Sequence, residues 1–427
     1  LHLLSRRQRQ MCIRDRDIRG DNNMINICIV APFDYPIPAI KGGALEQVVE
    51  NLCVENEKRE CLNITVLATE SKDIIKNNYK FTNFIYFNKT AIDKMWFYCF
   101  RIIKKIIGIY IPAYPRMIKV KKWLEKNNNR FDLIVYEDGL TYMLPYLFKN
   151  IDRNKVVSHL HWIGDPNKKT NYFFSELLPV SKFVGDEWIN NCSHPYIDVS
   201  VVKNGIDIDK FNKKLSEKEK TVIRNELGIN NEAFIILYVG RIIPEKGISE
   251  LIEAINIINN DNVVLLLIGA AKFALNGMTV YEKKVKELIE KSSNNIIQLG
   301  YIKNNELYKY QNIADIAVIP TIIEEAAPLA CVENMAAGLP IIITNSGGMP
   351  EYAGKKCSII VEKDANLQYS LAKQIKDLIE NKDKRKAMGR YAELEATNYS
   401  ITNMYNEFYK TLKLKVEKNN EVNKDKA

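Results

Sequence analysis

The feature that most constrains the fold is a rhythm of short apolar segments, each followed by a turn and then by apolar residues at helical spacing. This rhythm runs through the first 200 residues and then starts again. Short apolar strands that alternate with helices are typical of parallel sheets covered by helices on both faces. The predicted strands are residues 25–31, 64–68, 132–136 and 155–161 in the first half, and 234–239, 263–268, 296–299, 316–319 and 341–344 in the second.

With 427 residues, the chain is too long for one hydrophobic core. We therefore expect an α/β protein with two Rossmann-like, doubly wound domains that face a ligand-binding cleft. The rhythm restarts near residues 200–204, which predicts domains over 24–203 and 204–395. Residues 396–414 are predicted to form a helix that returns to the first domain. Residues 415–427 are predicted to be a charged, disordered tail.

The first 23 residues differ from the rest because six arginines crowd into them, whereas later basic positions are mostly lysine. We expect residues 1–23 to be a non-native or disordered leader, with Met24 as the native start. No apolar h-region marks a signal peptide, and no apolar run has the length of a membrane span. The eight cysteines are scattered without a Cys-x-x-Cys pair, which argues against a zinc site or disulfide framework and suits a reducing cytosol.

The chain carries 61 Lys and Arg against 52 Asp and Glu, a formal net charge of +9. Such a surplus fits anionic partners, including nucleotide diphosphates, lipid headgroups and nucleic acid. A merely lysine-rich surface explains the charge equally well, so charge alone does not choose between these readings.

Two basic residues follow the predicted strand 234–239. Arg241 comes at its carboxyl end, where α/β folds bind ligands, and Lys246 comes in the next turn, just before a helix. Two cations beside a helix N-terminus suit a diphosphate. The alternative is a solvated basic turn.

Two acids flank the start of a further helix, in which Pro328 suits the first turn and Gly338 the C-terminal cap. Glu325 then lies just before this helix and Glu333 inside it. Eight residues at helical rise span about 12 Å. That spacing suits two contacts to an extended ligand rather than a carboxylate pair, although acids are also common at helix N-termini.

Glycine pairs and histidines add weaker signals. Gly347 and Gly348 follow a strand, and Gly42 and Gly43 lead into a helix. Glycines there allow close backbone approach to a ligand, but they also mark ordinary turns.

His159 and His161 lie two apart on a predicted strand and so share one face. Metal ligation would need further ligands. A polar contact at the strand end is the expected role, and a structural histidine is the alternative.

Several motifs then follow one another in a single order. They are Val-Lys-Asn-Gly-Ile-Asp (202–207), Tyr-Val-Gly-Arg-x4-Lys-Gly (238–247), Leu-Leu-Ile-Gly (266–269), Leu-Gly-Tyr-Ile (299–302), Ala-Asp-Ile-Ala-Val-Ile-Pro (314–320), Glu325-x7-Glu333, Met-Ala-Ala-Gly-Leu-Pro (335–340) and Asn-Ser-Gly-Gly-Met-Pro-Glu (345–351). This series resembles glycosyltransferase family 4, which has the GT-B fold. The resemblance is nearly continuous over residues 200–355. In the first domain it rests on the Gly42-Gly43 loop and the strand ending at His161.

The resemblance implies a retaining, metal-independent glycosyltransferase without a cofactor, in which the nucleotide sugar is a co-substrate. Arg241 and Lys246 would neutralise the donor diphosphate, and Glu333 would hold the ribose. Glu325 would face the donor sugar, and His161 would lie near it, with His159 in reserve. The remaining implied donor contacts, several of them through the backbone, are Gly43, Ile302, Ala326, Ala327, Pro328 and Leu329.

One departure from the family pattern concerns the donor sugar. Many members follow the first Glu with Phe-Gly, whereas Ala326-Ala327-Pro328-Leu329 follow Glu325 here. The expected donor is therefore left open: a UDP-sugar is favoured and GDP-mannose is an alternative. A hexose or N-acetylhexosamine would pass to a glycan or lipid-linked acceptor in surface polysaccharide or glycoconjugate synthesis.

Residues 94–127 mix aromatic and basic residues with isoleucines, as in a helix that lies on an anionic membrane. We expect a cytoplasmic protein, with this segment as a possible contact to the inner face of the plasma membrane. The alternative is a domain helix that buries its apolar stripe. The bases in the segment are Arg101, Lys104, Lys105, Arg116, Lys119, Lys121 and Lys122.

Three rival functions remain. A GT-B epimerase or phosphorylase does not suit the Arg241, Lys246, Glu325 and Glu333 set. A catalytically inactive carbohydrate-binding relative would have lost donor-site residues, but each position that can be checked is filled. Nucleic-acid binding rests on charge alone, without an aromatic-basic or helix-turn-helix signature, so no nucleic-acid partner is expected.

Overall fold

A computed structural model describes residues 24–33, 35–40, 43–71, 78–88, 91–92, 95–96, 99, 115–137, 147–162, 173–191, 197–271 and 278–424. The predicted leader 1–23 therefore lies outside the described residues. The chain divides into two compact units. The N-terminal unit draws on Leu1–Pro179, Gly185–Val202 and Met404–Ala427, and the C-terminal unit on Val180–Val184 and Lys203–Asn403.

The N-terminal unit is built on a seven-stranded parallel sheet in the order β3-β2-β1-β4-β5-β6-β7. The order reverses between β1 and β4, which makes that point the topological switch of the sheet. The strands are β1 (Ile25–Val30), β2 (Leu62–Thr69), β3 (Thr82–Phe87), β4 (Leu133–Glu137), β5 (Val156–Leu160), β6 (Glu176–Pro179) and β7 (Asp198–Val199).

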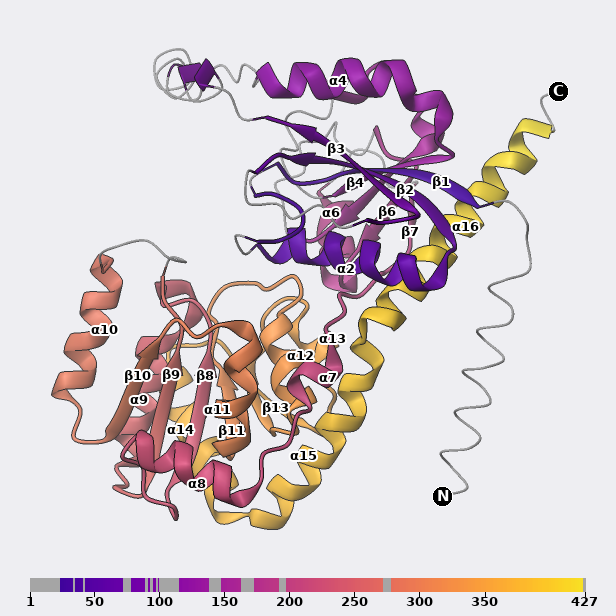
Figure 1. Cartoon of the computed structure of the whole chain (residues 1–427). Helices are drawn as coiled ribbons and strands as arrows, with labels where there is room; N and C mark the ends of the chain where they lie inside the picture. Colours follow the sequence, from indigo (N-terminus) through magenta and orange to yellow (C-terminus); the bar gives the residue numbers. More distant parts are fainter. Residues whose placement is uncertain are drawn as a thin grey trace, which may run out of the picture. The chain divides into compact units, whose positions relative to one another are not determined.

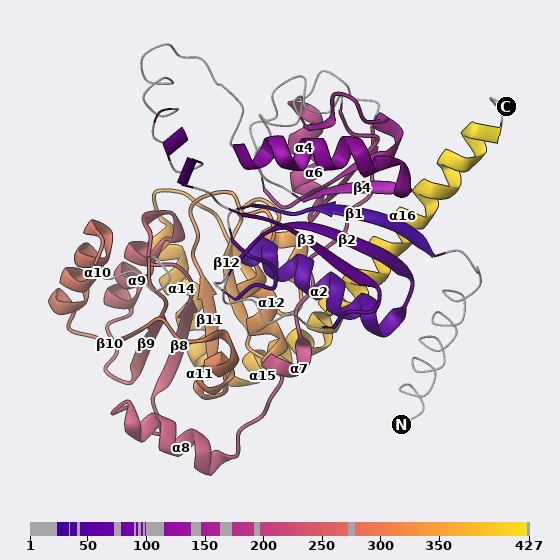
Figure 2. The ribbon, with the colours of Figure 1, turned by 45° about the horizontal axis from the view of Figure 1, so that its top comes forward.

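Helices cover both faces of this sheet. Figures 1 and 2 show α2 (Ala44–Arg59) and α4 (Pro115–Asn127) on opposite sides of it. The helix α6 (Lys182–Asn190) follows β6, and the last helix, α16 (Ile401–Lys424), supplies residues 404–424 to this unit.

The C-terminal unit repeats the plan with a six-stranded parallel sheet in the order β10-β9-β8-β11-β12-β13. Its strands are β8 (Phe234–Val239), β9 (Val263–Ile268), β10 (Asn295–Gly300), β11 (Ile316–Ile319), β12 (Ile341–Thr344) and β13 (Ser358–Val361). Its helices are α7 (Ile208–Phe211), α8 (Glu217–Glu226), α9 (Ile248–Ile258), α10 (Val280–Lys291), α11 (Leu307–Ile313), α12 (Leu329–Ala336), α13 (Met349–Tyr352), α14 (Leu367–Glu380) and α15 (Lys382–Ala396). The switch point here lies between β8 and β11.

Alternate residues of each central strand enter two separate cores. Ile235 and Leu237 of β8 pack in the core that contains α11, α12 and α13. Ile236 and Tyr238 pack in the core that contains α9 and α14. The sheet is buried on both faces, which explains why its strands are continuous apolar runs in the sequence. The predicted pair of Rossmann-like, doubly wound sheets is thus confirmed.

The prediction of a disordered tail from Lys415 is wrong for the described residues, because α16 continues to Lys424. Lys415 is buried, and its ammonium donates to the Ser175 carbonyl oxygen at 3.3 Å. Lys418 pairs with Asp198 at 2.6 Å. The charged residues that suggested a solvated tail therefore hold the helix against the end of the sheet.

The segment 94–127 is described only in part, since residues 94, 97–98 and 100–114 lie outside the described residues. In α4 the apolar stripe Met117, Val120 and Leu124 is buried. Arg116, expected as a membrane-facing base, is also buried: its guanidinium lies 5.0 Å from the Phe33 ring and donates to the Thr69 hydroxyl at 3.2 Å. Lys119 and Lys122 are exposed. Among the described helices, none is long and apolar enough to cross a membrane.

Candidate functional site

Three loops meet at the carboxyl edge of the C-terminal sheet, where β8, β11 and β12 lie side by side around the switch point. The first loop follows β8 and contains Arg241 and Lys246. The second follows β11 and contains Glu325. The third follows β12 and contains Gly347 and Gly348. Residues as far apart in the sequence as Arg241 and Gly348, 107 positions, are thus brought to the point where doubly wound sheets bind ligands.

Backbone hydrogen bonds join the loops after β8 and β11. The Ile322 amide donates to the Glu245 carbonyl oxygen at 3.0 Å. Gly247, with a φ of +67°, closes the β8 loop against Pro320; a Cβ on it would lie 1.9 Å from the Pro320 carbonyl oxygen. Glycine is therefore required at 247 for both its backbone angle and the close approach.

The acid and the base of the predicted site are in direct contact. The Lys246 ammonium forms a short ion pair with the Glu325 carboxylate, and both side chains are mostly buried. The Thr321 hydroxyl oxygen lies 3.0 Å from the same carboxylate and 3.0 Å from the Glu245 carbonyl oxygen. This network holds a cation and a carboxylate in fixed positions at the sheet edge.

Arg241 differs from Lys246 in that its side chain is exposed. Its backbone carbonyl oxygen accepts a hydrogen bond from the buried Tyr238 hydroxyl at 2.9 Å, which fixes the start of the loop. Its guanidinium makes no ion pair with the residues that the structure describes. The guanidinium therefore presents its five N–H donors to solvent from the loop that also carries Lys246.

The helix α12 begins at Leu329 with Pro328 as its N-cap residue, so the backbone of residues 326–329 forms its amino end. Glu325 precedes the helix and Glu333 lies inside it, as predicted. Ala326 is partly buried, and Ala327 and Leu329 pack against one core of the unit. A helix amino end carries partial positive charge and unsatisfied N–H groups, which favours an anion there.

Glu333 is held from the side by Asn304, whose amide donates to its carboxylate at 3.3 Å. Burial raises the pKa of Glu333, and only the Asn304 hydrogen bond and the charge of Lys210 oppose that shift. Burial removes water from this carboxylate and so disfavours its charged form. A carboxylate placed in this way is typical of a binding position rather than of a stabilising ion pair.

We expect Glu333→Gln to raise the free energy of unfolding by about 1 kcal/mol near neutral pH. Because the pKa is raised in the folded state, the wild-type chain loses stability as the pH rises above the ordinary value of 4.5 and through the folded pKa. The advantage of the variant should therefore appear over that range and then level off. Denaturant unfolding from pH 4 to 8 measures it. Glu287→Gln, at an exposed acid of α10, is the control and should show no such trend.

The glycine pair after β12 supports the loop that carries Glu325. The Gly348 amide donates to the Glu325 carbonyl oxygen at 2.7 Å. A Cβ on Gly347, whose φ is +52°, would lie 2.4 Å from the same oxygen, and one on Gly348 would lie 2.3 Å from the Ala326 carbonyl oxygen. These glycines therefore pack against the Glu325 loop.

Two further motif residues have roles within the C-terminal unit. Ile302 lies just after β10, partly buried against the core. Glu351 caps the start of α6: its carboxylate accepts hydrogen bonds from the amides of Lys182 and Phe183 at 2.7 and 2.8 Å. The acid that ends the Ser-Gly-Gly motif thus has a structural role.

At the carboxyl edge of the N-terminal sheet, Glu137 at the end of β4 lies between the two histidines of β5 and its following turn. The His159 Nδ1 is 3.1 Å and the His161 Nε2 is 2.8 Å from one carboxylate oxygen of Glu137. All three side chains are buried. Burial alone would raise the pKa of Glu137, but the two imidazoles outweigh it and hold the pKa below its usual range.

The same three residues are a group that could hold a metal ion in the described part of the chain. Their ligand atoms all lie within 4.8 Å of one another. Two histidines and one carboxylate form a ligand set used by zinc and non-haem iron sites. The structure thus places Glu137, a third side chain that could ligate a metal, beside the two histidines.

Gly43, the N-cap residue of α2, has a φ of +119°. Near it, the carboxylate of Glu46 accepts a hydrogen bond from the Tyr35 amide at 3.3 Å, and that of Glu50 accepts one from the Ala39 amide at 2.8 Å. Acids of α2 therefore fix the loop that follows β1, beside the switch point of this sheet. Gly42 lies outside the described residues.

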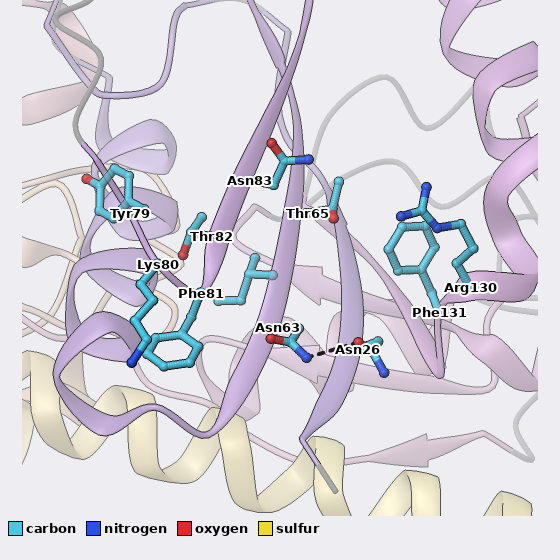
Figure 3. Close-up of a pocket in the computed structure, with 11 residues that line it drawn as sticks. Asn26, Asn63, Thr65, Tyr79, Lys80, Phe81, Thr82, Asn83, Arg130 and Phe131 are labelled. Atoms are coloured by element: carbon cyan, nitrogen blue, oxygen red, sulfur yellow. Dashed lines mark hydrogen bonds between the residues drawn. The ribbon is translucent and has the colours of Figure 1, made fainter.

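A hollow of about 410 Å³ opens at the amino ends of the strands of the N-terminal sheet, opposite the carboxyl ends where Glu137 lies. It is lined at the amino ends of β1, β2 and β3 by Asn26, Asn63 and Asn83, with an Asn63–Asn26 hydrogen bond of 3.1 Å (Figure 3). None of the predicted site residues lines it. Ligands of doubly wound sheets bind at the opposite, carboxyl edge.

The structure adds residues that the sequence did not single out: Glu137 beside the histidines, Thr321 beside Glu325, and Asn304 and Lys210 beside Glu333. Glu137 directly follows the predicted strand 132–136, but only the strand register, which pairs it with His159, shows that they meet. Thr321 lies in a loop and Asn304 begins the single 3-10 turn Asn304–Glu306, and neither is long enough for periodicity to carry a signal.

Comparisons with known proteins agree with this arrangement. Residues 219–395 match the family model described as Glycosyl transferases group 1. The chain is 27% identical over 388 residues to spore coat protein SA of Bacillus subtilis, which covers 87% of this chain and 94% of that protein. It is 24% identical over 306 residues to the lipopolysaccharide 1,2-N-acetylglucosaminetransferase of Salmonella typhimurium, covering 71% and 77%.

A solved structure shares the fold over nearly the whole chain. The Anabaena protein HepE, crystallised with UDP and glucose, aligns with a TM-score of 0.67 and 19% identity, covering 91% of this chain and 99% of that one. The two parallel-sheet domains are therefore of the GT-B type. Together, the comparisons support a GT-B glycosyltransferase.

Proposed function

We propose that this chain is a retaining GT-B glycosyltransferase that moves a hexose or N-acetylhexosamine from a nucleotide diphosphate sugar to a glycan or lipid-linked acceptor. One observation carries the proposal. Arg241, Lys246 and Glu325 stand on neighbouring loops at the switch point of the C-terminal sheet, beside the amino end of α12. This combination offers cations for a diphosphate and a carboxylate for sugar hydroxyls.

The leaving group is a nucleoside diphosphate, so charge builds on its phosphate oxygens as the sugar departs. Arg241 and Lys246 would neutralise that charge, and the amides of residues 326–329 would add the partial charge of the helix end. The acceptor hydroxyl oxygen would bond to the anomeric carbon on the face from which the diphosphate leaves. Its proton would pass to the departing phosphate oxygen, so the configuration is retained without a covalent intermediate.

The remaining residues would orient the donor. Glu325 would accept hydrogen bonds from the sugar hydroxyls, and Glu333 would accept them from the ribose. Ile302 and its neighbours would meet the base. Gly43 and His161 are the contributions that we propose from the N-terminal unit. Arg241, Lys246 and the amino end of α12 would supply the positive charge that a divalent ion would otherwise bring to the diphosphate. The proposed reaction therefore needs neither a metal nor a cofactor.

The acceptor is proposed on broader grounds. One relative is named a lipopolysaccharide 1,2-N-acetylglucosaminetransferase, and from this we infer a surface polysaccharide or glycoconjugate acceptor here. A cytoplasmic location at the inner membrane face follows from that acceptor. Exposed Met95 and Trp96, together with Lys119 and Lys122 of α4, support contact with an anionic membrane through residues 94–127.

A donor screen tests the proposal. We expect the chain to release nucleoside diphosphate from one of UDP-glucose, UDP-N-acetylglucosamine, UDP-galactose or GDP-mannose, at the same rate with and without EDTA. UDP-sugars are favoured. Proton NMR of the product would show the anomeric configuration of the donor.

Each alternative has its own result. Loss of turnover in EDTA would contradict metal independence, and an inverted product would contradict the retaining course. A folded chain that binds glycans but no nucleotide or nucleotide sugar would instead be an inactive carbohydrate-binding relative.

A further inference from the structure

A patch of polar side chains lies on one face of β1, β2 and β3, at the amino ends of these strands. Asn63 and Thr65 are two apart on β2, so their side chains leave the same face of the sheet. Asn26 on β1 is paired with Asn63, and Asn83 on β3 is paired with Thr65. The register therefore places four polar side chains on three neighbouring strands, which lie about 4.8 Å apart (Figure 3).

This patch is unusual for its position in the sheet. Both β1 and β2 are inner strands, and inner strands of a parallel sheet are normally apolar because helices cover both faces. Here Asn63 and Asn83 are exposed, and Asn26 and Thr65 are only partly buried. All four line the hollow of about 410 Å³, a volume within the range of about 300–1,000 Å³ for small-molecule sites. The described residues therefore leave this stretch of the sheet open to a ligand.

The patch has unused hydrogen-bonding capacity. The Asn63 amide donates to the Asn26 side-chain oxygen at 3.1 Å, which joins these two carboxamides (Figure 3). Asn83 and Thr65 have no side-chain hydrogen bond to any residue that the structure describes. A carboxamide both donates and accepts, as a hydroxyl group does, so a row of carboxamides matches the hydroxyl groups of a sugar ring.

Two cations line the hollow, and no carboxylate among the described residues does. Lys80 and Arg130 are both exposed, and Figure 3 shows them on opposite sides of the patch. The Lys80 ammonium is 3.9 Å from the exposed carboxylate of Glu60, which makes that ion pair weak. Arg130 donates to the Asn127 side chain at 3.3 Å and forms no ion pair within the described part of the chain. This positive charge favours an anionic ligand.

The carboxylates nearest to the hollow hold its walls in place. Glu57 of α2 accepts hydrogen bonds from the amides of Lys80 and Phe81 at 2.7 and 3.0 Å. Asp132 accepts one from the Asn26 amide at 2.8 Å. These bonds fix the turn before β3 and the start of β1, so the walls are formed before a ligand arrives. A preformed site binds its ligand at a lower cost in conformational entropy.

We propose that this hollow is a second, non-catalytic binding site for a glycan with acidic sugars, which carry a carboxylate or a phosphate. The carboxamides and Thr65 would contact ring hydroxyls, and Lys80 and Arg130 would contact the acidic groups. The eight residues of β2 span about 26 Å, so the hollow is separate from the carboxyl edge of its own sheet. This inference rests on the proposed function, because a glycosyltransferase has a glycan as its acceptor or product.

A glycan array probed with the labelled full chain tests the site. The array holds oligosaccharides with uronic acids, oligosaccharides with sugar phosphates, neutral oligosaccharides and inorganic polyphosphate. Neutral sugars supply hydroxyl groups without charge, and polyphosphate supplies charge without ring hydroxyls. We expect one of the two acidic classes to bind about 10-fold or more tightly than either of these controls. The class that binds identifies the acidic group.

Substitutions in the hollow should weaken this binding without unfolding the chain. Asn83→Asp keeps the shape of an exposed side chain but adds a negative charge, and Arg130→Gln removes a positive charge. Each should lower the affinity for acidic glycans about 10-fold or more. Asn225→Asp and Arg390→Gln make the same changes at exposed positions of α8 and α15 and should leave binding unchanged.

Donor turnover separates this site from the proposed donor site. Asn83→Asp and Arg130→Gln should release nucleoside diphosphate at the wild-type rate, whereas Arg241→Ala should lose turnover and keep glycan binding. If the wild type turns over no donor, the proposed function fails, while the array still decides whether the hollow binds glycans.

Three results would overturn the inference. The first is the absence of binding to any glycan on the array. The second is equal binding of polyphosphate or neutral sugars, which would show that charge and hydroxyl groups are not recognised together. The third is wild-type affinity for acidic glycans in both Asn83→Asp and Arg130→Gln, which would place the glycan elsewhere on the chain.

Discussion

Replacement of Arg241 by alanine is expected to lower kcat/KM for the sugar donor about 10³-fold, the upper range for removing one preorganised donor from a developing anion. The Arg241 side chain is exposed, so the folded chain should lose little stability. The loss should lie mostly in kcat, because charge grows on the diphosphate as the sugar leaves. Steady-state kinetics and thermal melts on the same preparations would separate the two effects.

Two variants serve as controls for that result. Arg241→Lys keeps the charge but lacks the planar pair of donors, so it should recover only part of the rate. Arg390→Ala removes an exposed arginine of α15 and should leave the kinetics unchanged. Equal rates for Arg241→Ala and the wild type would remove Arg241 from the donor site.

Gly347→Ala is expected to impair both stability and activity. The residue has a φ of +52°, and a Cβ there would lie 2.4 Å from the Glu325 carbonyl oxygen and 2.9 Å from its amide nitrogen. The left-handed backbone costs about 1–2 kcal/mol for alanine, and the overlap with a second backbone costs about 1–3 kcal/mol more. Relief of the overlap must move Glu325, which should lower kcat/KM about 100-fold.

Gly228→Ala isolates the first of these costs. Gly228 has a similar φ of +67°, but no atom lies within 4 Å of the position that a Cβ would take. It should lose only the left-handed penalty and keep full activity. If the two variants unfold at the same denaturant concentration and are equally active, Gly347 does not support the Glu325 loop.

The positions of strands inside the two sheets were predictable because buried parallel strands are continuous apolar runs. The segments at 234–239, 263–268 and 341–344 match β8, β9 and β12. Among the edge strands, β10 was predicted at 296–299, whereas β3 and β13 were not: β3 includes Asn83, and β13 leaves Ile360 exposed at 41%. An edge strand is buried on fewer sides, so it tolerates polar residues and loses the pattern.

The candidate site was predictable where a motif is continuous in the sequence, as for Arg241 with Lys246 and for Glu325 with Glu333. It was not predictable where three-dimensional register creates the contact. The Glu137–His159 pairing depends on which residues of β4 and β5 fall opposite each other, and Thr321 depends on the approach of two loops. The helical end of the chain was also missed, because the lysines that stabilise it look like those of a solvated tail.

The position of α16 in the chain has a consequence for biosynthesis. The Tyr405 hydroxyl meets the buried Asn56 side chain at 2.6 Å, across 349 residues of sequence, and Phe408 packs on His159. The N-terminal unit thus lacks part of its core until α16, which follows the main segment of the C-terminal unit, has been synthesised. Contacts of such long range form late, so a nascent or truncated chain exposes this apolar surface while the second domain is already complete. A nonsense mutation at or before the codon for Met404 should therefore destabilise the N-terminal unit, although that unit lies mostly upstream of it.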